Sequence, residues 1–273
     1  MTDKELGEAI RAGRRVYGTL IVSTSPHWVR QVGTLGLDFV FIDTEHVPID
    51  RATLAWMCNA YRAIGLPPIV RIPAPDLYGA CMALDAGACG ILAPYVETPE
   101  QVAELRGAVK FRPLKGELLA RALAGEPLPR RLSEYIRKNT EQNLLFVNVE
   151  SVPAMERLDE LLAVSGVDGA VIGPHDLSSS LGIPEEYGHP RFDEAVRTII
   201  AACRAAGVAS GAHISHEGGT EQEIAWARAG ATLMFHSGDI SLFARAMRQD
   251  LEQMRSALGD EPAAPETASE VIV

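Results

Sequence analysis

Short apolar runs alternate with amphipathic segments along most of the chain. The runs are bounded by turn residues and are too short for helices, which is typical of buried strands. Eight strands are expected, at Tyr17–Val22, Phe39–Ile42, Pro68–Arg71, Gly90–Ala93, Leu144–Val149, Gly169–Ile172, Gly207–Gly211 and Ala231–Phe235. Between and around them the apolar spacing predicts helices at about Lys4–Arg11, Ile49–Gly65, Leu77–Ala86, Thr98–Val109, Val152–Ala163, Pro190–Ala206, Thr220–Ala229 and Ile240–Arg255. This alternation predicts a TIM (β/α)8 barrel preceded by an N-terminal helix.

Two stretches interrupt the alternation. The segment Arg112–Gln142 is charged and contains three prolines, and we expect a short helix in it near Leu132–Thr140. We interpret it either as an elaborated loop over the face where the strands end or as an interface element. The barrel is expected to form one domain over residues 1–256. The remaining residues, 257–273, are rich in Ala, Pro and Glu and are expected to be a disordered tail.

The stretch from Leu144 to Gly182 contains the most informative chemistry. It reads as a β-α-β unit, so its two strands should lie parallel and close together. Glu150 directly follows the first strand, and Asp176 lies just beyond the second. Two carboxylates at the strand ends suit a divalent cation that keeps positions open for water and substrate. The alternative is that Glu150 caps the following helix and Asp176 caps a short 3₁₀ turn.

Polar residues also follow the other predicted strands. If the barrel forms, one face collects Ser23, Asp43, Glu45, His46, Arg71, Pro94, Glu150, Asp176, His213 and His236. The planar guanidinium of Arg71 is suited to a carboxylate or an enolate oxygen, although a salt bridge to Asp43 or Glu45 is an equal alternative. His46 is the natural general base, because imidazole titrates near working pH, although a loop histidine that is merely solvated is an equal alternative.

Two further features are less specific. Gly173–Ser178 resembles an anion nest, in which the amides of His175 and Asp176 could hold a carboxylate. Asp85 lies near the end of an otherwise apolar helix, and from its position alone we would expect a surface charge. The chain has no phosphate loop, no GxGxxG after a strand and no GxSxG.

Composition narrows the class of partner. The 273 residues are 47% hydrophobic, and 25 basic against 36 acidic side chains give a net charge of −11. This charge argues against nucleic acid and against an anionic membrane. The four cysteines show no CxxC spacing, and the N-terminus is charged and amphipathic, unlike a signal peptide. A reduced, cytoplasmic location is the simplest interpretation.

Several segments together resemble the HpcH/HpaI aldolases, metal-dependent class II pyruvate aldolases related to citrate lyase β subunits. The similarity extends over roughly Tyr17–Leu251. It rests on FIDTEHVPID, IVRIP, LDAGACGILAPYVET, VNVESVPAMERLDELL, VDGAVIGPHDLSSSLG and GATLMFHSGDISLFARAM.

The resemblance implies reversible retro-aldol cleavage of a 4-hydroxy-2-oxo acid to pyruvate and an aldehyde through a metal-bound enolate. It implies Mg²⁺, Mn²⁺ or Co²⁺ on Glu150 and Asp176, and a homo-oligomer, dimeric or hexameric, that exchanges its last helix. It makes His46, Arg71 and Asp85 catalytic, with Asp85 the partner of His46 across a subunit boundary. The expected substrate-binding residues are Asp43, Arg71, Asn148, His175 and Asp176.

The chain departs from the family at two positions. The family often has Gln before the metal-binding Glu, where this chain has Asn148, and it often has a small residue where this chain has His175. The loop after the fourth strand also differs. These departures bear on the expected aldehyde specificity more than on the expected metal binding or enolate chemistry. Two alternatives stay open: a lyase acting on a malyl- or citramalyl-CoA type thioester, and a barrel that binds a ligand without turnover.

Overall fold

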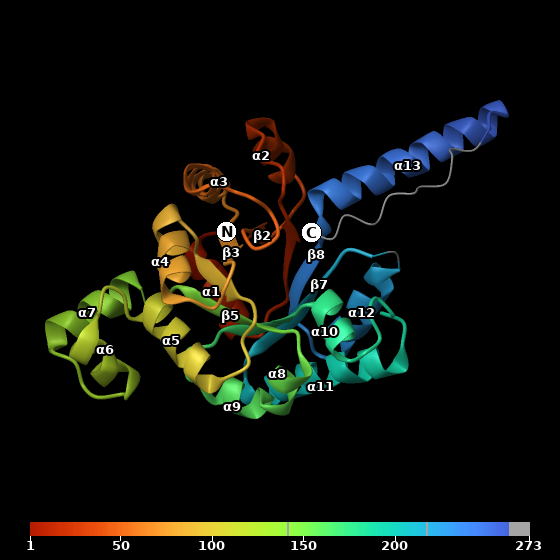
Figure 1. Cartoon of the computed structure of the whole chain (residues 1–273). Helices are drawn as coiled ribbons and strands as arrows, with labels where there is room; N and C mark the ends of the chain where they lie inside the picture. Colours follow the sequence, from red (N-terminus) through yellow and green to blue (C-terminus); the bar gives the residue numbers. More distant parts are fainter. Residues whose placement is uncertain (141, 217, 262–273) are drawn as a thin grey trace.

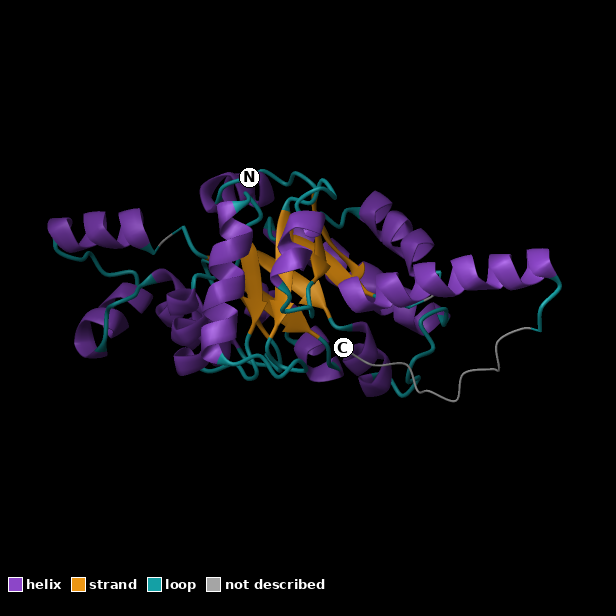
Figure 2. Ribbon diagram, turned by 90° about the horizontal axis from the view of Figure 1, so that it is seen from above, coloured by secondary structure: helices purple, strands orange, loops and turns teal. Residues whose placement is uncertain are grey.

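Eight parallel strands close into a barrel in the computed structural model of the chain, which describes residues 1–140, 142–216 and 218–261. Each strand pairs with the next in sequence, and β8 pairs with β1. The strands lie together at the centre of the molecule, with helices around them (Figure 2). The strands are β1 Val16–Leu20, β2 Phe39–Asp43, β3 Pro68–Arg71, β4 Gly90–Ala93, β5 Leu144–Val149, β6 Gly169–Ile172, β7 Ala209–Ile214 and β8 Leu233–Gly238. The TIM barrel predicted from the sequence is confirmed.

Helices surround the barrel and extend from it (Figure 1). They are α1 Asp3–Arg11, α2 Pro26–Val32, α3 Arg51–Ala63, α4 Leu77–Ala86, α5 Pro99–Lys110, α6 Gly116–Leu123, α7 Arg130–Asn139, α8 Val152–Glu156, α9 Leu158–Ala163, α10 Pro174–Ser180, α11 Pro190–Ala206, α12 Gly219–Ala229 and α13 Asp239–Leu258. Within the described residues, none of these helices is both long and apolar enough to cross a membrane.

The strands bury both of their faces, as parallel strands in a barrel do. Side chains at alternate positions, such as Phe39 and Phe41 of β2, fill the barrel interior. The intervening positions, such as Val40 and Ile42, pack against the surrounding helices. Leu6 of α1 belongs to the interior cluster, so the N-terminal helix contributes to the same core. The polar residues are thereby left to the ends of the strands.

The seventh and eighth strands end later than the sequence predicts. We expected β7 to end at Gly211, but a glycine within a strand often marks a close approach of another backbone. In the barrel, a Cβ at Gly211 would lie 1.8 Å from the Leu233 carbonyl oxygen, so this glycine allows close approach of β8 and does not end β7. β7 continues to Ile214, and β8 continues from Phe235 through the polar residues His236–Gly238. His213 therefore lies within a strand.

The interrupting segment contains two helices where we expected one. α6 was missed, and it packs on α5 through Leu119, whose methyl carbon would lie 3.3 Å from a Cβ at Gly107. Since the segment connects the end of α5 to the start of β5, it leaves the barrel where the strands begin and projects beside α5 (Figure 1). The expectation of a loop over the strand-end face is therefore wrong.

Smaller differences concern the following helices. The helix expected at Val152–Ala163 is divided into α8 and α9 at Arg157. α13 continues to Leu258 and projects away from the barrel (Figure 1). The first two residues of the expected tail are thus helical, and its residues 262–273 lie outside the described part of the chain.

Candidate active site

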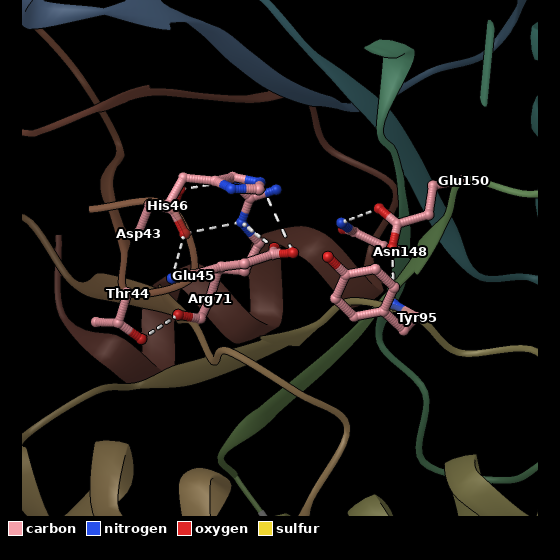
Figure 3. A network of polar contacts seen from close by, with 8 residues as sticks. All are labelled: Asp43, Thr44, Glu45, His46, Arg71, Tyr95, Asn148 and Glu150. Atoms are coloured by element: carbon pink, nitrogen blue, oxygen red, sulfur yellow. Dashed lines mark hydrogen bonds and ion pairs between the residues drawn. The ribbon is translucent and has the colours of Figure 1, made fainter. Parts of the chain in front are cut away.

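A network of polar side chains lies where β2, β3, β4 and β5 end (Figure 3). In parallel α/β folds this end of the strands is the usual ligand-binding face. Asp43 and Arg71 are the last residues of β2 and β3, and they are register partners in the sheet. Strand pairing therefore places two opposite charges side by side, as their positions in the sequence suggested.

Arg71 is buried and is held from two sides. Its Nε and Nη2 donate to Asp43 Oδ1 and Oδ2 at 2.9 and 2.6 Å, and its Nε lies 3.1 Å from Glu45 Oε2. The guanidinium carbon lies 5.6 Å from the centre of the Phe41 ring. The salt bridges weighed as an alternative role for Arg71 are thus both present. Within the described residues Nη1 makes no hydrogen bond, so one edge of the guanidinium can still take a ligand.

The Asp43–Arg71 pair is also electrostatically fixed. Burial alone would raise the pKa of Asp43, but the hydrogen bonds and charge of Arg71 outweigh burial and lower this pKa. Asp43 Oδ1 additionally accepts the backbone N–H of Glu45 at 2.9 Å. Thr44 ties the two strand ends together, since its hydroxyl donates to the Arg71 carbonyl at 2.6 Å. Within the chain Asp43 therefore positions Arg71, and its contact with a substrate stays a prediction.

Glu150 is the buried carboxylate of the site. Its Oε1 accepts the Tyr95 N–H and its Oε2 accepts the Asn148 side-chain amide, both at 2.7 Å. Ser151, not Glu150, caps α8, because its hydroxyl accepts the Ala154 N–H. The capping alternative for Glu150 is therefore wrong. Burial raises the pKa of Glu150, and the nearby charges of Asp176 and Glu45 raise it further.

Asp176 lies in the first turn of the α-helix α10, whereas the capping alternative placed it as the cap of a short 3₁₀ turn. The N-cap position belongs to Gly173, and no side chain caps this helix. Gly173 also leaves room for the Glu150 carboxylate, because a Cβ at this position would lie 2.8 Å from Glu150 Oε2. The Asp176 side chain is thus free of a capping role and close enough to Glu150 to influence its pKa.

These residues fit a divalent cation with an incomplete protein coordination shell. Among the described residues, no group of three or more His, Cys, Asp and Glu side chains is arranged around an ion position. Mg²⁺ typically uses one or two carboxylates and leaves other positions to water and substrate. Each Glu150 oxygen accepts one hydrogen bond and keeps a second lone pair. Asn148 Oδ1 is buried without a hydrogen-bond partner among the described residues, so the site contains an unsatisfied acceptor beside Glu150.

Tyr95 belongs to the site and was missed by the sequence analysis. It follows β4 with a left-handed backbone conformation (φ 54°), which costs a non-glycine residue about 1–2 kcal/mol. In this conformation its N–H reaches Glu150, and its hydroxyl faces Glu45 (Figure 3). Interaction with Glu45 raises the pKa of Tyr95 to about 12, so the phenol stays protonated. Its place directly after Pro94 at a strand end was the available signal.

His46 lies at the edge of the network (Figure 3), and His175 precedes Asp176 in α10. His46 is exposed, and its Nε2 lies 3.7 Å from Glu45 Oε1. His175 Nδ1 is buried without a hydrogen-bond partner among the described residues and lies 3.6 Å from Glu185 Oε1. Asn148 contacts Glu150, so within the chain it positions the carboxylate. Contact of Asn148 and His175 with a substrate stays a prediction.

Asp85 is not joined to His46 within one chain. Its side chain is 69% exposed on α4 and pairs with Arg112. An exposed position is compatible with the expected contact across a subunit boundary, which a single chain does not test.

Comparison with known proteins relates this barrel to one family. The family model described as HpcH/HpaI aldolase/citrate lyase matches residues 17–241. The 2-keto-3-deoxy-L-rhamnonate aldolase of Escherichia coli (strain K12) is 32% identical over 249 residues, covering 91% of this chain and 92% of the relative.

Solved structures agree with the sequence comparison. An HpcH/HpaI aldolase/citrate lyase family protein from Burkholderia cenocepacia J2315 superposes with a TM-score of 0.78 at 31% identity, covering 92% of this chain and 99% of the other. The HpcH/HpaI aldolase from Desulfitobacterium hafniense DCB-2 has a TM-score of 0.79 at 26% identity, with coverages of 97% and 99%. The chain belongs to the HpcH/HpaI aldolase/citrate lyase family and is a carbon–carbon lyase.

Proposed function

We propose that the chain is a divalent-metal-dependent class II aldolase that cleaves a 4-hydroxy-2-oxo acid to pyruvate and an aldehyde. The observation that carries the proposal is a buried carboxylate, Glu150, in the field of Asp176 and near an arginine with one free edge. The name of the E. coli relative supports the substrate class, because a 2-keto-3-deoxy sugar acid has the 2-oxo and 4-hydroxy groups that this cleavage needs.

Glu150 and Asp176 are the residues that would hold Mg²⁺, Mn²⁺ or Co²⁺. When bound, the cation supplies Lewis-acid polarisation of the keto group and offsets negative charge that develops on its oxygen. Negative charge exceeds positive charge among these residues, which favours a metal cation: Asp43, Glu45 and Glu150 interact with Arg71, and Asp176 interacts with Glu150. Asp43 and Glu45 already pair with Arg71, which leaves the other two carboxylates for the metal.

Arg71 binds and orients the keto acid. Its two ion pairs and its contact with Phe41 hold the guanidinium plane, so Nη1 is pre-oriented towards a substrate oxygen. A fixed donor stabilises the enolate oxygen without reorganising as charge develops on it. Burial of Arg71 strengthens this interaction, because water competes less for the donor.

Proton transfer is assigned to His46. In cleavage His46 accepts the proton of the C4 hydroxyl, the C3–C4 bond breaks, and its electron pair forms the enolate of pyruvate as the aldehyde leaves. Transfer of this proton from His46 to C3 of the enolate then completes pyruvate and restores the neutral imidazole. Asp85 of a neighbouring copy would orient His46, which its exposure on α4 allows. Glu45 is the acidic neighbour of His46 within the chain.

The active form is proposed to be a homo-oligomer that exchanges α13. The exposed apolar side chains of α13 recur every three or four residues: Ile240, Phe243, Met247, Leu251, Met254 and Leu258. A stripe of this length on a projecting helix is unusual for a monomer and typical of an interface. Its packing on a second copy would cover the stripe.

The test is replacement of Glu150 by Gln, which keeps the size of the side chain and removes its charge. After removal of metals with EDTA, we expect Mg²⁺, Mn²⁺ or Co²⁺ to restore pyruvate release from 2-keto-3-deoxy-L-rhamnonate in the natural protein. In E150Q the restored rate should fall by about 100-fold or more. Glu156→Gln, on the exposed surface of α8, is the matched control and should keep full activity.

Retention of full metal-stimulated activity in E150Q would contradict the proposal. The same assay with a malyl-CoA type thioester separates it from the thioester-lyase alternative, in which only the thioester would be cleaved. Calorimetry with each cation tests the second alternative, a barrel that binds a ligand without turnover, because that alternative predicts no metal binding.

A further inference from the structure

The inner surface of the barrel carries one histidine that the proposed chemistry does not use. His213 is on β7, two residues after Gly211 and four after Ala209, which belongs to the interior cluster. Alternation along the strand therefore directs His213 inward. Its ring packs edge-on against Phe41, with ring centres 5.4 Å apart, and Phe41 also lies under Arg71. His213 thus lines the same mouth as Arg71.

One hydrogen bond determines the tautomer of His213. Its Nε2 lies 3.0 Å from the carbonyl oxygen of Ser237 in β8. A carbonyl oxygen can only accept, so the ring hydrogen is on Nε2 and Nδ1 carries a lone pair. Within the described residues Nδ1 has no hydrogen-bond partner, and it is not among the fully buried unpartnered atoms. His213 therefore presents an acceptor that solvent or a ligand can reach.

The ring is neutral at neutral pH. Burial, and next the charge of Arg71, lower the pKa of His213 to about 4. A neutral acceptor with so low a basicity is a poor general base near pH 7. It is, however, suited to accept a hydrogen bond from a ligand hydroxyl.

The chemistry of the substrate shows which part would meet this acceptor. Pyruvate and its enolate have carboxylate and keto or enolate oxygens, which all accept hydrogen bonds and suit Arg71 and a cation. An acceptor nitrogen such as Nδ1 cannot form a hydrogen bond with these oxygens. In the proposed cleavage the C4 hydroxyl donates its proton to His46, so a further hydrogen-bond donor is available only if the aldehyde half carries a hydroxyl group of its own.

We infer that His213 is a specificity-determining residue that selects hydroxyaldehydes, accepting a hydrogen bond from the aldehyde's hydroxyl group at Nδ1. The inference rests on the proposed function and narrows its substrates to 4-hydroxy-2-oxo acids with a further hydroxyl group beyond C4. A site that offers a buried polar partner rejects analogues that lack the matching group more strongly than an apolar pocket can.

The experiment compares two aldehydes that differ by one hydroxyl group. Rates of pyruvate addition to lactaldehyde and to propanal are measured for the natural protein, His213→Leu and His213→Asn. We expect the natural protein to prefer lactaldehyde, and H213L to lose about tenfold or more of kcat/KM for lactaldehyde with little change for propanal. H213N keeps an acceptor and should recover part of the preference. His27→Leu, on the exposed surface of α2, is the matched control.

A separate readout monitors the pyruvate half alone. Exchange of the pyruvate methyl protons in D₂O with added Mn²⁺ needs the enolate but no aldehyde, so it should be unchanged in H213L. The role of His213 is overturned if methyl-proton exchange persists and H213L either loses kcat/KM equally for both aldehydes or keeps the preference of the natural protein for lactaldehyde. If the natural protein shows no metal-dependent exchange, the proposed function itself fails.

Discussion

Replacing Asp43 by Asn should weaken both the fold and the site, because Asp43 is the main partner of a buried arginine. The substitution keeps the size of the side chain but removes its charge and places an amide donor against a guanidinium donor. Breaking a buried ion pair from one side costs about 3–5 kcal/mol. We expect the lower end, about 3 kcal/mol in the free energy of unfolding, because Glu45 still lies 3.1 Å from Arg71.

The pH dependence of this loss has a definite sign. The pKa of Asp43 is lower in the folded protein than in the unfolded chain, where it is about 3.9. Asp43 therefore stabilises the fold above about pH 4, and its contribution is lost as the pH falls through the folded value. The difference in unfolding free energy between the natural protein and D43N should be constant from about pH 7 to 5 and decrease below about pH 4.

The assay is urea unfolding at a series of pH values in EDTA, with each curve extrapolated to zero urea. Asp250→Asn, an exposed position on α13, is the control and should change stability by less than about 0.5 kcal/mol. A difference for D43N below about 1 kcal/mol at pH 7, or one that persists unchanged at pH 3, would refute the reasoning.

Two further changes test the metal site and the interface. Gly173→Ala should weaken divalent-cation binding by about 10–100-fold in calorimetry, because the added Cβ would lie 2.8 Å from Glu150 Oε2, while Gly188→Ala, with no atom within 4 Å, should not. Equal affinities would argue against Glu150 as a ligand. Phe243→Glu places a charge in the apolar stripe of α13 and should lower the mass measured by light scattering, unlike Gln249→Glu on the same helix. An unchanged mass would exclude the stripe from the interface.

Two parts of the barrel mouth have different roles in the proposed site. Arg71 from β3 and Glu150 after β5 face the keto acid in the proposed reaction, whereas His213 comes from β7 on another part of the ring. Tyr95 connects the two acidic groups of the first part, since its N–H binds Glu150 and its hydroxyl faces Glu45 (Figure 3). Its left-handed backbone is a local cost of about 1–2 kcal/mol retained at a functional position.

Sequence alone was sufficient for the barrel, because hydrophobic periodicity is a local property. Four consecutive strands, β3 to β6, have the predicted limits, as do α4 and α11. Local patterns failed where tertiary contacts set the boundary. Gly211 resembles a strand end, yet it is required by the close approach of β8, and α6 depends on packing against α5.

For the candidate site residues, the sequence predicted their positions but not their partners. Their positions at strand ends were readable from the sequence, because every parallel strand delivers its C-terminal residues to one face. Their partners were not. That Arg71 meets both Asp43 and Glu45, that Tyr95 turns its amide to Glu150, and that Asp85 pairs with Arg112 depend on register, barrel closure and backbone conformation. These relations join segments distant in sequence, and only the tertiary structure decides which side chains come within bonding distance.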